Sequence, residues 1–523
     1  MRKKSAMLAA FLGLSLAVSG CGGGASKPES PGAAPSEGPK GGDANKEIRM
    51  IMQYGLFDPA KEYTSQYINE KTGYNVEYEM LPAEKANEKL NLLVANKESF
   101  DVMKLNSEQF YNLATSGALE PIDDLLAAHG NHINQAIKPE SWGSATIDGK
   151  KYAIPETGAG VSVGEELVVR QDWLDELGLS IPTTTDELYN VLKTIKEKKN
   201  IIPLTGSKDS VYGDIAYGDI AATFGILTDW KEVDGKLVHK AEQPEMKEFL
   251  AFMNKLYKEG LLDTEMPINT AQKAIEKFAS GKAAVYKLAW WNAGSTISAL
   301  NQNFPDAKVS VIPYLKGKDG KAVVGADTKT SWFIAIPKSS KNKEEAMKFL
   351  NAKLEPETFK GLAIGTEGVH HEVKDGKYYP ILPKFNDDLG NASAFVTGVD
   401  EEKYPIYWQA RVRKDPIVQN YFETFQKNAE GIIVIDPMSK APPINAVSKN
   451  TLKLRTLLND NMLKFISGSE PLENYDKFLE QWRAEGGADM VKAANEWYQT
   501  KKIIGGFTSS LRSRLLFFQK KFR

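Results

Sequence analysis

The segments EIRMIMQ (47–53), NVEYEM (75–80) and FDVMKL (100–105) are three short, strand-like stretches rich in apolar side chains. Between them, Asp58–Lys71 and Glu84–Ala95 follow the spacing of amphipathic helices, with apolar residues three and four positions apart. Strands that alternate with helices of about ten or more residues are typical of a parallel sheet covered by helices. These stretches therefore predict an α/β fold.

The same alternation continues through the centre of the chain. Thr185 is expected to cap the helix at 186–198, because its hydroxyl can accept a backbone N–H of the first turn. Residues 401–501 are expected to be mainly helical. Further strands are expected at 151–155, 167–170, 281–288, 309–313 and 332–337, and further helices at 107–115, 172–177, 243–259, 270–279 and 343–353.

The composition fits a large folded protein. Hydrophobic residues make up 42% and charged residues 26% of the 523 residues, so the chain can bury a sizeable core. The formal net charge of −2 argues against a nucleic-acid-binding protein. The segment Lys501–Arg523 is basic and has no acidic residue. With a single cysteine, Cys21, the chain has neither an intramolecular disulfide nor a cysteine-rich metal site.

The N-terminus has the pattern of an export signal. Basic residues precede the apolar stretch Ala6–Val18, which is long enough for a signal sequence and too short to span a bilayer. The next residues, Ser19-Gly20-Cys21, complete a sequence that resembles a bacterial lipobox, in which the cysteine is acylated. The following residues are rich in Gly, Pro and Ser and are expected to be a flexible linker. We therefore expect a signal peptide at 1–20 and a lipid-anchored linker at 21–46.

Known catalytic motifs are absent or lie in the wrong context. Gly160, Ser162 and Gly164 match the G-x-S-x-G spacing of a nucleophile elbow, but that turn leads into a helix and a strand-like segment follows here. No P-loop and no H-E-x-x-H sequence occurs. The histidine pairs 129/132 and 370/371 lack a third ligand in register, so no metal site is expected. The 68 acidic residues leave a glycosidase-type carboxylate pair neither identified nor excluded.

Several short phrases follow one another along the chain in a fixed order. They are SFDVM (99–103), SGALEPI (116–122), DGKKYAIP (148–155), LVVR (167–170), FASGKAAV (278–285), IPK (336–338) and AMKFL (346–350). In this order they resemble the extracellular solute-binding proteins of ABC importers, in the maltose-binding-protein-like class (family 1), and above all the long lipoproteins that serve oligosaccharide importers. The resemblance covers roughly residues 47–500.

This resemblance implies a two-lobed fold of the periplasmic-binding-protein-like kind (type II), with the ligand in a cleft between the lobes and extra helices at the C-terminus. The first lobe is expected to comprise 47–160 plus 325–395, and the second 161–324 plus 396–500. The chain would cross between lobes near 155–163 and again near 323–329. Residues 501–523 are basic with interleaved Leu and Phe, which fits either a disordered extension or a segment that lies on an anionic membrane.

The resemblance also suggests ligand-binding residues. Trp290 and Trp291 stand where this class places a stacking aromatic of the second lobe, and we expect one of them to contact ligand because a strand buries one of two neighbours per face. Aromatic faces suit the apolar faces of sugar rings. Trp332 is as compatible with a core position. The full expected set is Trp142, Tyr152, Glu156, Trp290, Trp291, His370, Trp408 and Arg411.

The predicted function is that of a lipid-anchored, monomeric substrate-binding protein that captures an oligosaccharide by cleft closure and delivers it to an ABC permease. No catalytic residue, cofactor or metal is expected, and the lysine-rich segment 197–203 lacks the oxygens of the calcium loop in similar alginate-oligosaccharide binders. A uronate ligand would use Arg170, Arg411 or Arg413 as charge partner. The alternatives are a surface-anchored glycosidase or lyase, a ligand-binding co-sensor for a membrane kinase, and a carrier of peptide or metal.

Overall fold

The computed structural model describes residues 46–160, 163–208, 218–326, 330–439 and 441–500. The predicted signal peptide, Cys21, nearly all of the linker and the basic tail from Lys501 lie outside the described residues. No helix in the described ranges is both long and apolar enough to cross a bilayer.

The first sheet has five strands in the order β2-β1-β3-β14-β6. The strands β1, β2 and β3 are parallel, as their alternation with helices predicts. The strand β14 is antiparallel to both β3 and β6, so the prediction of a wholly parallel sheet is wrong for this strand. The five strands are β1 (Lys46–Met52), β2 (Tyr74–Met80), β3 (Val102–Leu105), β6 (Ala153–Glu156) and β14 (Trp332–Ala335).

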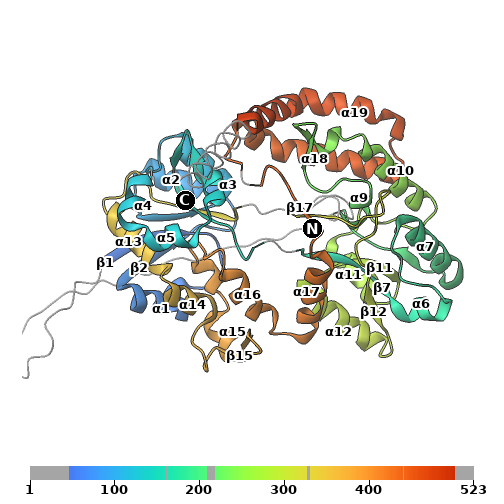
Figure 1. The fold of residues 1–523 in the computed structure, drawn as a ribbon, viewed down its shortest axis with the longest axis horizontal. Helices are drawn as coiled ribbons and strands as arrows, with labels where there is room; N and C mark the ends of the chain where they lie inside the picture. Colours follow the sequence, from blue (N-terminus) through green and yellow to red (C-terminus); the bar gives the residue numbers. More distant parts are fainter. Residues whose placement is uncertain (1–45, 161–162, 209–217, 327–329, 440, 501–523) are drawn as a thin grey trace, which may run out of the picture. The chain divides into compact units, whose positions relative to one another are not determined.

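Helices on both sides of β14 in the sequence pack with the five-stranded sheet (Figure 1). They are α1 (Tyr63–Thr72), α2 (Ala86–Ala95), α3 (Ser107–Thr115), α4 (Asp123–His129), α5 (Asn131–Ala136), α13 (Lys343–Lys353), α14 (Pro356–Ile364), α15 (Lys384–Leu389) and α16 (Tyr404–Val412). Short elements complete this part: 3₁₀ turns at Pro59–Lys61, Pro139–Ala145 and Ala392–Phe395, and the pairs β4 (Thr146–Ile147) with β5 (Lys150–Lys151) and β15 (His371–Lys374) with β16 (Lys377–Pro380).

The second sheet has four strands in the order β12-β7-β11-β8. The central strand β11 is parallel to β8 and antiparallel to β7, and β12 is antiparallel to β7. The expectation of a parallel sheet is therefore correct only for the β8–β11 pair. The strands are β7 (Glu165–Arg170), β8 (Ile202–Leu204), β11 (Ala283–Ala289) and β12 (Val309–Val311).

The remaining elements pack with the four-stranded sheet (Figure 1). The helices are α6 (Gln171–Leu177), α7 (Thr185–Lys199), α9 (Gly218–Thr223), α10 (Glu245–Lys258), α11 (Ala271–Ala279), α12 (Ala293–Asn303), α17 (Pro416–Ala429), α18 (Asn445–Ser467) and α19 (Tyr475–Trp482), with 3₁₀ turns at Lys240–Glu242, Leu472–Asn474 and η4 (Trp290–Asn292) and a π turn at Arg483–Gly487. Two-stranded ladders join β9 (Trp230–Val233) to β10 (Lys236–His239) and β13 (Val324–Ala326) to β17 (Ile433–Ile435).

Each sheet has its own buried core. Ile48, Met50 and Phe349 belong to the core of the five-stranded sheet, whereas Leu167 and Phe249 belong to that of the four-stranded sheet. Burial of apolar surface contributes roughly 25 cal/mol per Å². Both parts therefore have a stabilising core that does not depend on contact with the other.

The packing of α16 differs from the lobe boundary that the sequence suggested at residue 396. Val399, Tyr404 and Ala410 are buried in the core of the five-stranded sheet, and only from α17 onward does the C-terminal part pack with the four-stranded sheet. An amphipathic helix shows in its sequence that it has an apolar face, but not which sheet will cover that face. The C-terminal segment that packs with the four-stranded sheet therefore begins after Val412.

The helix α7 is capped by Thr184 and not by Thr185. Thr184 has extended backbone angles, and its hydroxyl accepts the backbone N–H of Glu187, whereas Thr185 is the first helical residue. A capping residue must have non-helical φ and ψ, which two successive threonines do not reveal in the sequence. The prediction was therefore wrong by one position.

Candidate ligand-binding site

One edge of the four-stranded sheet brings together the aromatic residues that are best suited to contact a ligand. Because β8 and β11 are parallel, their carboxyl ends share an edge, and the antiparallel β7 begins there. The backbone N–H of Trp290 donates to the carbonyl of Gly164 over 3.1 Å, which fixes the turn after β11 beside the start of β7. In open α/β sheets, ligands bind beyond the carboxyl ends of the strands.

Four aromatic side chains gather at this edge, and we call Trp290, Trp291, Trp408 and Phe422 the aromatic cluster. The Trp290 ring is at its centre, with centroids 5.2 Å from Trp291, 5.5 Å from Trp408 and 5.3 Å from Phe422. All three contacts are edge-to-face, the geometry that the ring quadrupoles favour. Trp408 lies on α16 and Phe422 on α17, so the cluster joins elements from the cores of both sheets.

The two adjacent tryptophans have different environments. Trp291 is 53% exposed, whereas its neighbours cover most of Trp290, whose Nε1–H has no acceptor among the described residues. The pair stands on the 3₁₀ turn η4, not on a strand, so the reason given for expecting one exposed member was wrong. Trp291 is the member that offers a free aromatic face.

The backbone of Gly164 supports the Trp291 ring. A Cβ atom at position 164 would lie 2.9 Å from that ring, closer than van der Waals contact allows. Glycine is therefore the residue that lets the indole lie against the start of β7.

Three of the predicted ligand residues lie on or beside β6 of the five-stranded sheet. Trp142 is buried, with the Lys151 ammonium 5.5 Å from its ring centroid, and Tyr152 is half-buried. The Glu156 carboxylate is buried, with Lys104 Nζ 3.0 Å from one oxygen and 3.2 Å from the other. Burial raises the pKa of Glu156, and the adjacent Lys104 opposes that shift.

The other two predicted residues also have partners within the chain. The His370 ring accepts the Thr366 backbone N–H at Nδ1 over 2.9 Å, and its Nε2 lies 3.0 Å from the Asp388 carboxylate. Both ring nitrogens are thus engaged. The Arg411 guanidinium donates to the Leu389 carbonyl over 2.9 Å.

Arg170, one of the cations considered for an acidic ligand, is remote from the aromatic cluster. It is at the far end of β7 from Gly164, about 20 Å away along the extended chain at roughly 3.3 Å per residue. It pairs with the Asp172 carboxylate over 2.6 Å and is only 2% exposed.

The structure thus brings together Trp290, Trp291 and Trp408 of the predicted set, and the ligand role of all eight residues stays a prediction. Sequence reasoning missed Phe422 and Gly164. Phe422 belongs to an amphipathic helix whose apolar stripe gave no sign of which residue would meet the tryptophans. In the sequence, Gly164 stands out only as part of the G-x-S-x-G spacing, and the strand β7 that follows it excludes the strand-to-helix turn of a nucleophile elbow.

A carboxyl group is buried close to the aromatic cluster. Glu166, two residues after Gly164, is 0% exposed and accepts a hydrogen bond from the Asn428 amide over 2.8 Å. Asn428 lies on α17, the helix that also carries Phe422. Burial, the largest effect, raises the pKa of Glu166 to about 8. The carboxyl group is therefore protonated at neutral pH.

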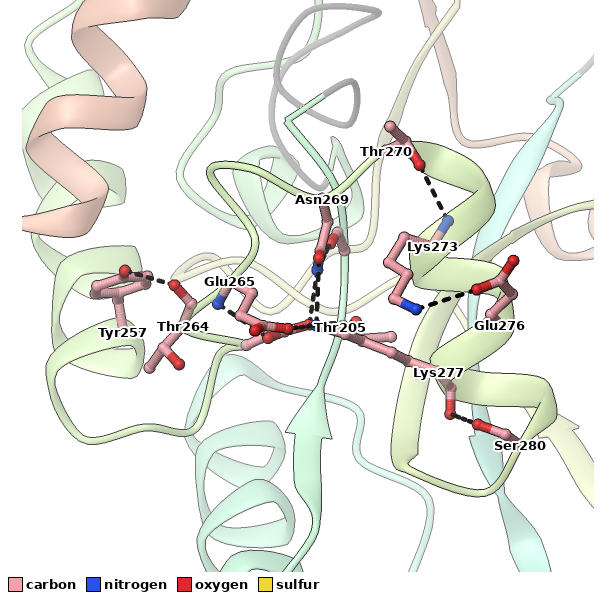
Figure 2. A network of polar contacts seen from close by, with 12 residues as sticks. Thr205, Tyr257, Thr264, Glu265, Asn269, Thr270, Lys273, Glu276, Lys277 and Ser280 are labelled. Carbon is pink, nitrogen blue, oxygen red and sulfur yellow. Dashed lines mark hydrogen bonds and ion pairs between the residues drawn. The ribbon is translucent and has the colours of Figure 1, made fainter.

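A second buried polar network holds the carboxyl end of β8 (Figure 2). The Asp263 carboxylate accepts hydrogen bonds from Thr205 Oγ1 over 2.8 Å and from the Asn269 amide over 2.9 Å. The Lys277 ammonium lies 2.8 Å from Asp263 and 2.7 Å from Glu265. The Lys277 and Asp263 side chains are 7% and 2% exposed, so water has little access to this ion pair and dissolved salt weakens it little. Because Thr205 directly follows β8, this network lies at the sheet edge that also carries the aromatic cluster.

No group of three or more His, Cys, Asp or Glu side chains within the described residues is arranged to hold a metal ion.

The chain resembles known binding proteins over most of its length. The family model for bacterial extracellular solute-binding proteins matches residues 56–358, more than half of the chain. The "uncharacterized protein in butB 5'region" of Niallia circulans is 63% identical over 255 residues, which is 49% of this chain and all of that protein. The polygalacturonan/rhamnogalacturonan-binding protein YtcQ of Bacillus subtilis is 25% identical over 495 residues, covering 89% of this chain and 94% of that protein.

The fold is shared with solved structures. The Streptococcus pneumoniae ABC-transporter substrate-binding protein FusA, in complex with kestose, superimposes with a TM-score of 0.63 at 20% identity. The match covers 88% of this chain and all of that structure.

The protonated state of Glu166 predicts a pH-dependent stability. The unfolded chain loses this proton near pH 4.5 and the folded protein near pH 8, so between these values the folded state binds more protons. The free energy of unfolding therefore falls by up to about 1.4 kcal/mol per pH unit across this window. Glu166→Gln mimics the neutral carboxyl group, and its stability relative to the native protein is expected to rise from pH 5 to pH 8 in denaturant titrations. Glu165→Gln, at a partly exposed neighbour, is the control. A constant difference for Glu166→Gln across this range contradicts the assignment.

The network around Asp263 predicts a large loss of stability when its cation is removed. Lys277→Met leaves the buried Asp263 carboxylate without a counter-charge, which is expected to cost about 3–5 kcal/mol. Lys273→Met, on the same helix, removes an exposed partner of Glu276 and is expected to cost less than about 1 kcal/mol. Urea unfolding of both variants measures the loss in the free energy of unfolding. Equal losses would show that the buried ion pair stabilises the protein no more than the exposed one does.

The contact between Gly164 and Trp291 predicts that Gly164→Ala changes the indole environment. The added methyl group has to displace the ring, which will shift tryptophan emission and quenching by acrylamide. In a Trp291→Phe background the same substitution should have little effect on the emission. An unchanged emission spectrum for Gly164→Ala alone would show that the ring has room to spare.

Proposed function

We propose that this chain, which belongs to the bacterial extracellular solute-binding protein family, captures an oligosaccharide for an ABC importer. The chain has the two-lobed fold of its structural relatives and is a binding protein, not an enzyme. The predicted fold class and family are therefore confirmed. We call the part built on the five-stranded sheet the first lobe and the part built on the four-stranded sheet the second lobe.

The observation that carries the proposal is the exposed indole of Trp291 at the carboxyl edge of the second lobe's sheet. Trp290 supports this ring from one side and is held in turn by Trp408 of the first lobe and by Phe422. A rigid aromatic face at a junction of two lobes suits a sugar ring, whose C–H face is apolar.

The similarity to YtcQ, whose name describes polygalacturonan and rhamnogalacturonan binding, supports a carbohydrate ligand for this chain. The lipobox-like sequence ending at Cys21 and the following Gly/Pro-rich linker support anchoring of the protein on the outer face of the cell membrane. In this proposal the ligand binds more tightly to a closed arrangement of the lobes, shifts the population toward it, and the closed form delivers the ligand to the permease.

The proposed stacking role of Trp291 predicts a loss of affinity on its removal. Trp291→Ala is expected to weaken oligosaccharide binding tenfold or more, which corresponds to about 1.4 kcal/mol, whereas Trp291→Phe retains part of the affinity. Isothermal titration of the full chain with a panel of neutral and acidic oligosaccharides identifies the ligand and measures this loss.

The matched control is Trp173→Phe, on α6 beside Arg170 at the opposite edge of the sheet. It is expected to leave the affinity unchanged. If no oligosaccharide of the panel binds, the sugar assignment is wrong. If one binds with equal affinity to Trp291→Ala, the ligand lies elsewhere.

A further inference from the structure

The described chain crosses between the lobes at several places, which we call passages. The contacts on either side of each passage show which part of the backbone can act as a hinge. The described chain passes from the first lobe to the second after β6, returns before β14, and passes again between α16 and α17. At each passage, side chains on both sides hold the backbone to one lobe or the other. The length of chain left between these attachments is short.

At the first passage, the attachment points are Thr157 and Val163. The Thr157 hydroxyl donates to the Glu401 carboxylate over 2.9 Å, and Glu401 also accepts from Ser141 over 3.0 Å, which ties this point to the first lobe. On the other side, the Gln426 amide of α17 bonds both the N–H and the carbonyl of Val163, over 3.3 and 2.9 Å.

The second passage has the same arrangement. Val324–Ala326 pairs with Ile433–Ile435, which directly follows α17 in the sequence and holds this point to the second lobe. On the first-lobe side, the Thr330 and Ser144 hydroxyl groups lie 2.6 Å apart and share a hydrogen bond.

At the third passage, the change of lobe falls between two neighbouring residues. The Lys414 ammonium lies 5.4 Å from the ring centroid of Phe385, a core residue of the first lobe. The Asp415 carboxylate caps α17 by accepting the backbone N–H groups of Ile417 and Val418 over 2.7 and 3.1 Å. The backbone between Lys414 and Asp415 is therefore the hinge of this passage.

One ion pair spans that hinge without being fully formed. Arg413, at the end of α16, is buried and donates to the Tyr378 carbonyl over 3.0 Å and to the Gln409 amide oxygen over 2.7 Å. Its Nη2 is 3.6 Å from the Glu423 carboxylate of α17, beyond hydrogen-bond distance, and its Nε has no acceptor among the described residues. The ammonium of Lys377, in the first lobe, is 3.9 Å from the same carboxylate.

We propose that Arg413 and Glu423 form a hinge latch that favours an arrangement of the lobes other than the one described here. A rotation of α17 about the Lys414–Asp415 hinge that closes the 3.6 Å gap lets the carboxylate bind the guanidinium in the two-bonded geometry that arginine favours. An unsatisfied buried donor is unfavourable, so completing these bonds stabilises the rotated arrangement. Glu423 thus acts as a positioning residue that sets the angle between the lobes without touching ligand. The consequence of this angle for ligand binding rests on the proposed function.

The latch is tested by measuring the distance between the lobes in the absence of any sugar. Spin labels at Asn91→Cys on α2 and Lys193→Cys on α7, both exposed, are introduced into the full chain carrying Cys21→Ser, because Cys21 is its single native cysteine. Pulsed electron paramagnetic resonance then gives the distance distribution. We expect the labelled protein to populate a second distance, and Glu423→Gln to reduce that population relative to the described one by about two- to fivefold, the range of a partly exposed ion pair.

Glu430→Gln is the matched control, because it removes the same charge from the exposed end of α17, away from Arg413. It is expected to leave the distribution unchanged. Arg413→Lys, which cannot bind a carboxylate in the two-bonded geometry, is expected to act in the same direction as Glu423→Gln. The latch is overturned if Arg413→Lys and Glu423→Gln both leave the distance distribution unchanged. It is also overturned if Glu430→Gln changes the distribution as much as Glu423→Gln does. Because no sugar is present, these results stand whether or not an oligosaccharide is the ligand.

Discussion

The separate hydrophobic cores of the two sheets are the constraint on which the rest of this structure depends. Each sheet buries its own set of apolar side chains, so folding stabilises each lobe internally and leaves the angle between the lobes to a small number of contacts. Those contacts are concentrated along α16 and α17, which are consecutive in the sequence but pack on different cores. The relative position of the lobes is therefore set by local side-chain chemistry and not by the bulk of the hydrophobic burial.

The aromatic cluster follows from this division. Trp290 and Trp291 come from the second lobe's sheet edge and Trp408 from a first-lobe helix, so their contact exists only because the two lobes meet at α16 and α17. Edge-to-face packing fixes the Trp290 ring and leaves Trp291 half exposed. A ligand that stacks on Trp291 would thus contact a surface whose support depends on the lobe angle, which couples capture to the hinge.

Several buried charges have partners within their own lobe. In the first lobe, Lys104 binds Glu156, and the fully buried Lys353 donates to the Phe395 carbonyl over 2.6 Å, with a pKa lowered to about 7 by burial. In the second lobe, Lys277 binds Asp263. The Arg413–Glu423 contact differs because its members belong to different lobes and its distance depends on their angle. This difference is why the latter pair, and not the stronger ones, can influence a conformational equilibrium.

The sequence by itself determined the class of the fold, most helix and strand positions, and the family, because hydrophobic periodicity and ordered phrases such as FASGKAAV are local properties of the chain. It also selected Trp290, Trp291 and Trp408 as candidates, through the resemblance to the family and the adjacency of the first two. It failed where the outcome depends on partners distant in the sequence. The antiparallel direction of β14, the assignment of α16 to the first lobe and the engagement of His370 and Glu156 by Asp388 and Lys104 all arise from long-range packing. Only the tertiary structure decided which tryptophan is exposed and which charges face each other across the hinge, because a residue's neighbours in space are fixed by how whole elements pack and not by the residues beside it in the chain.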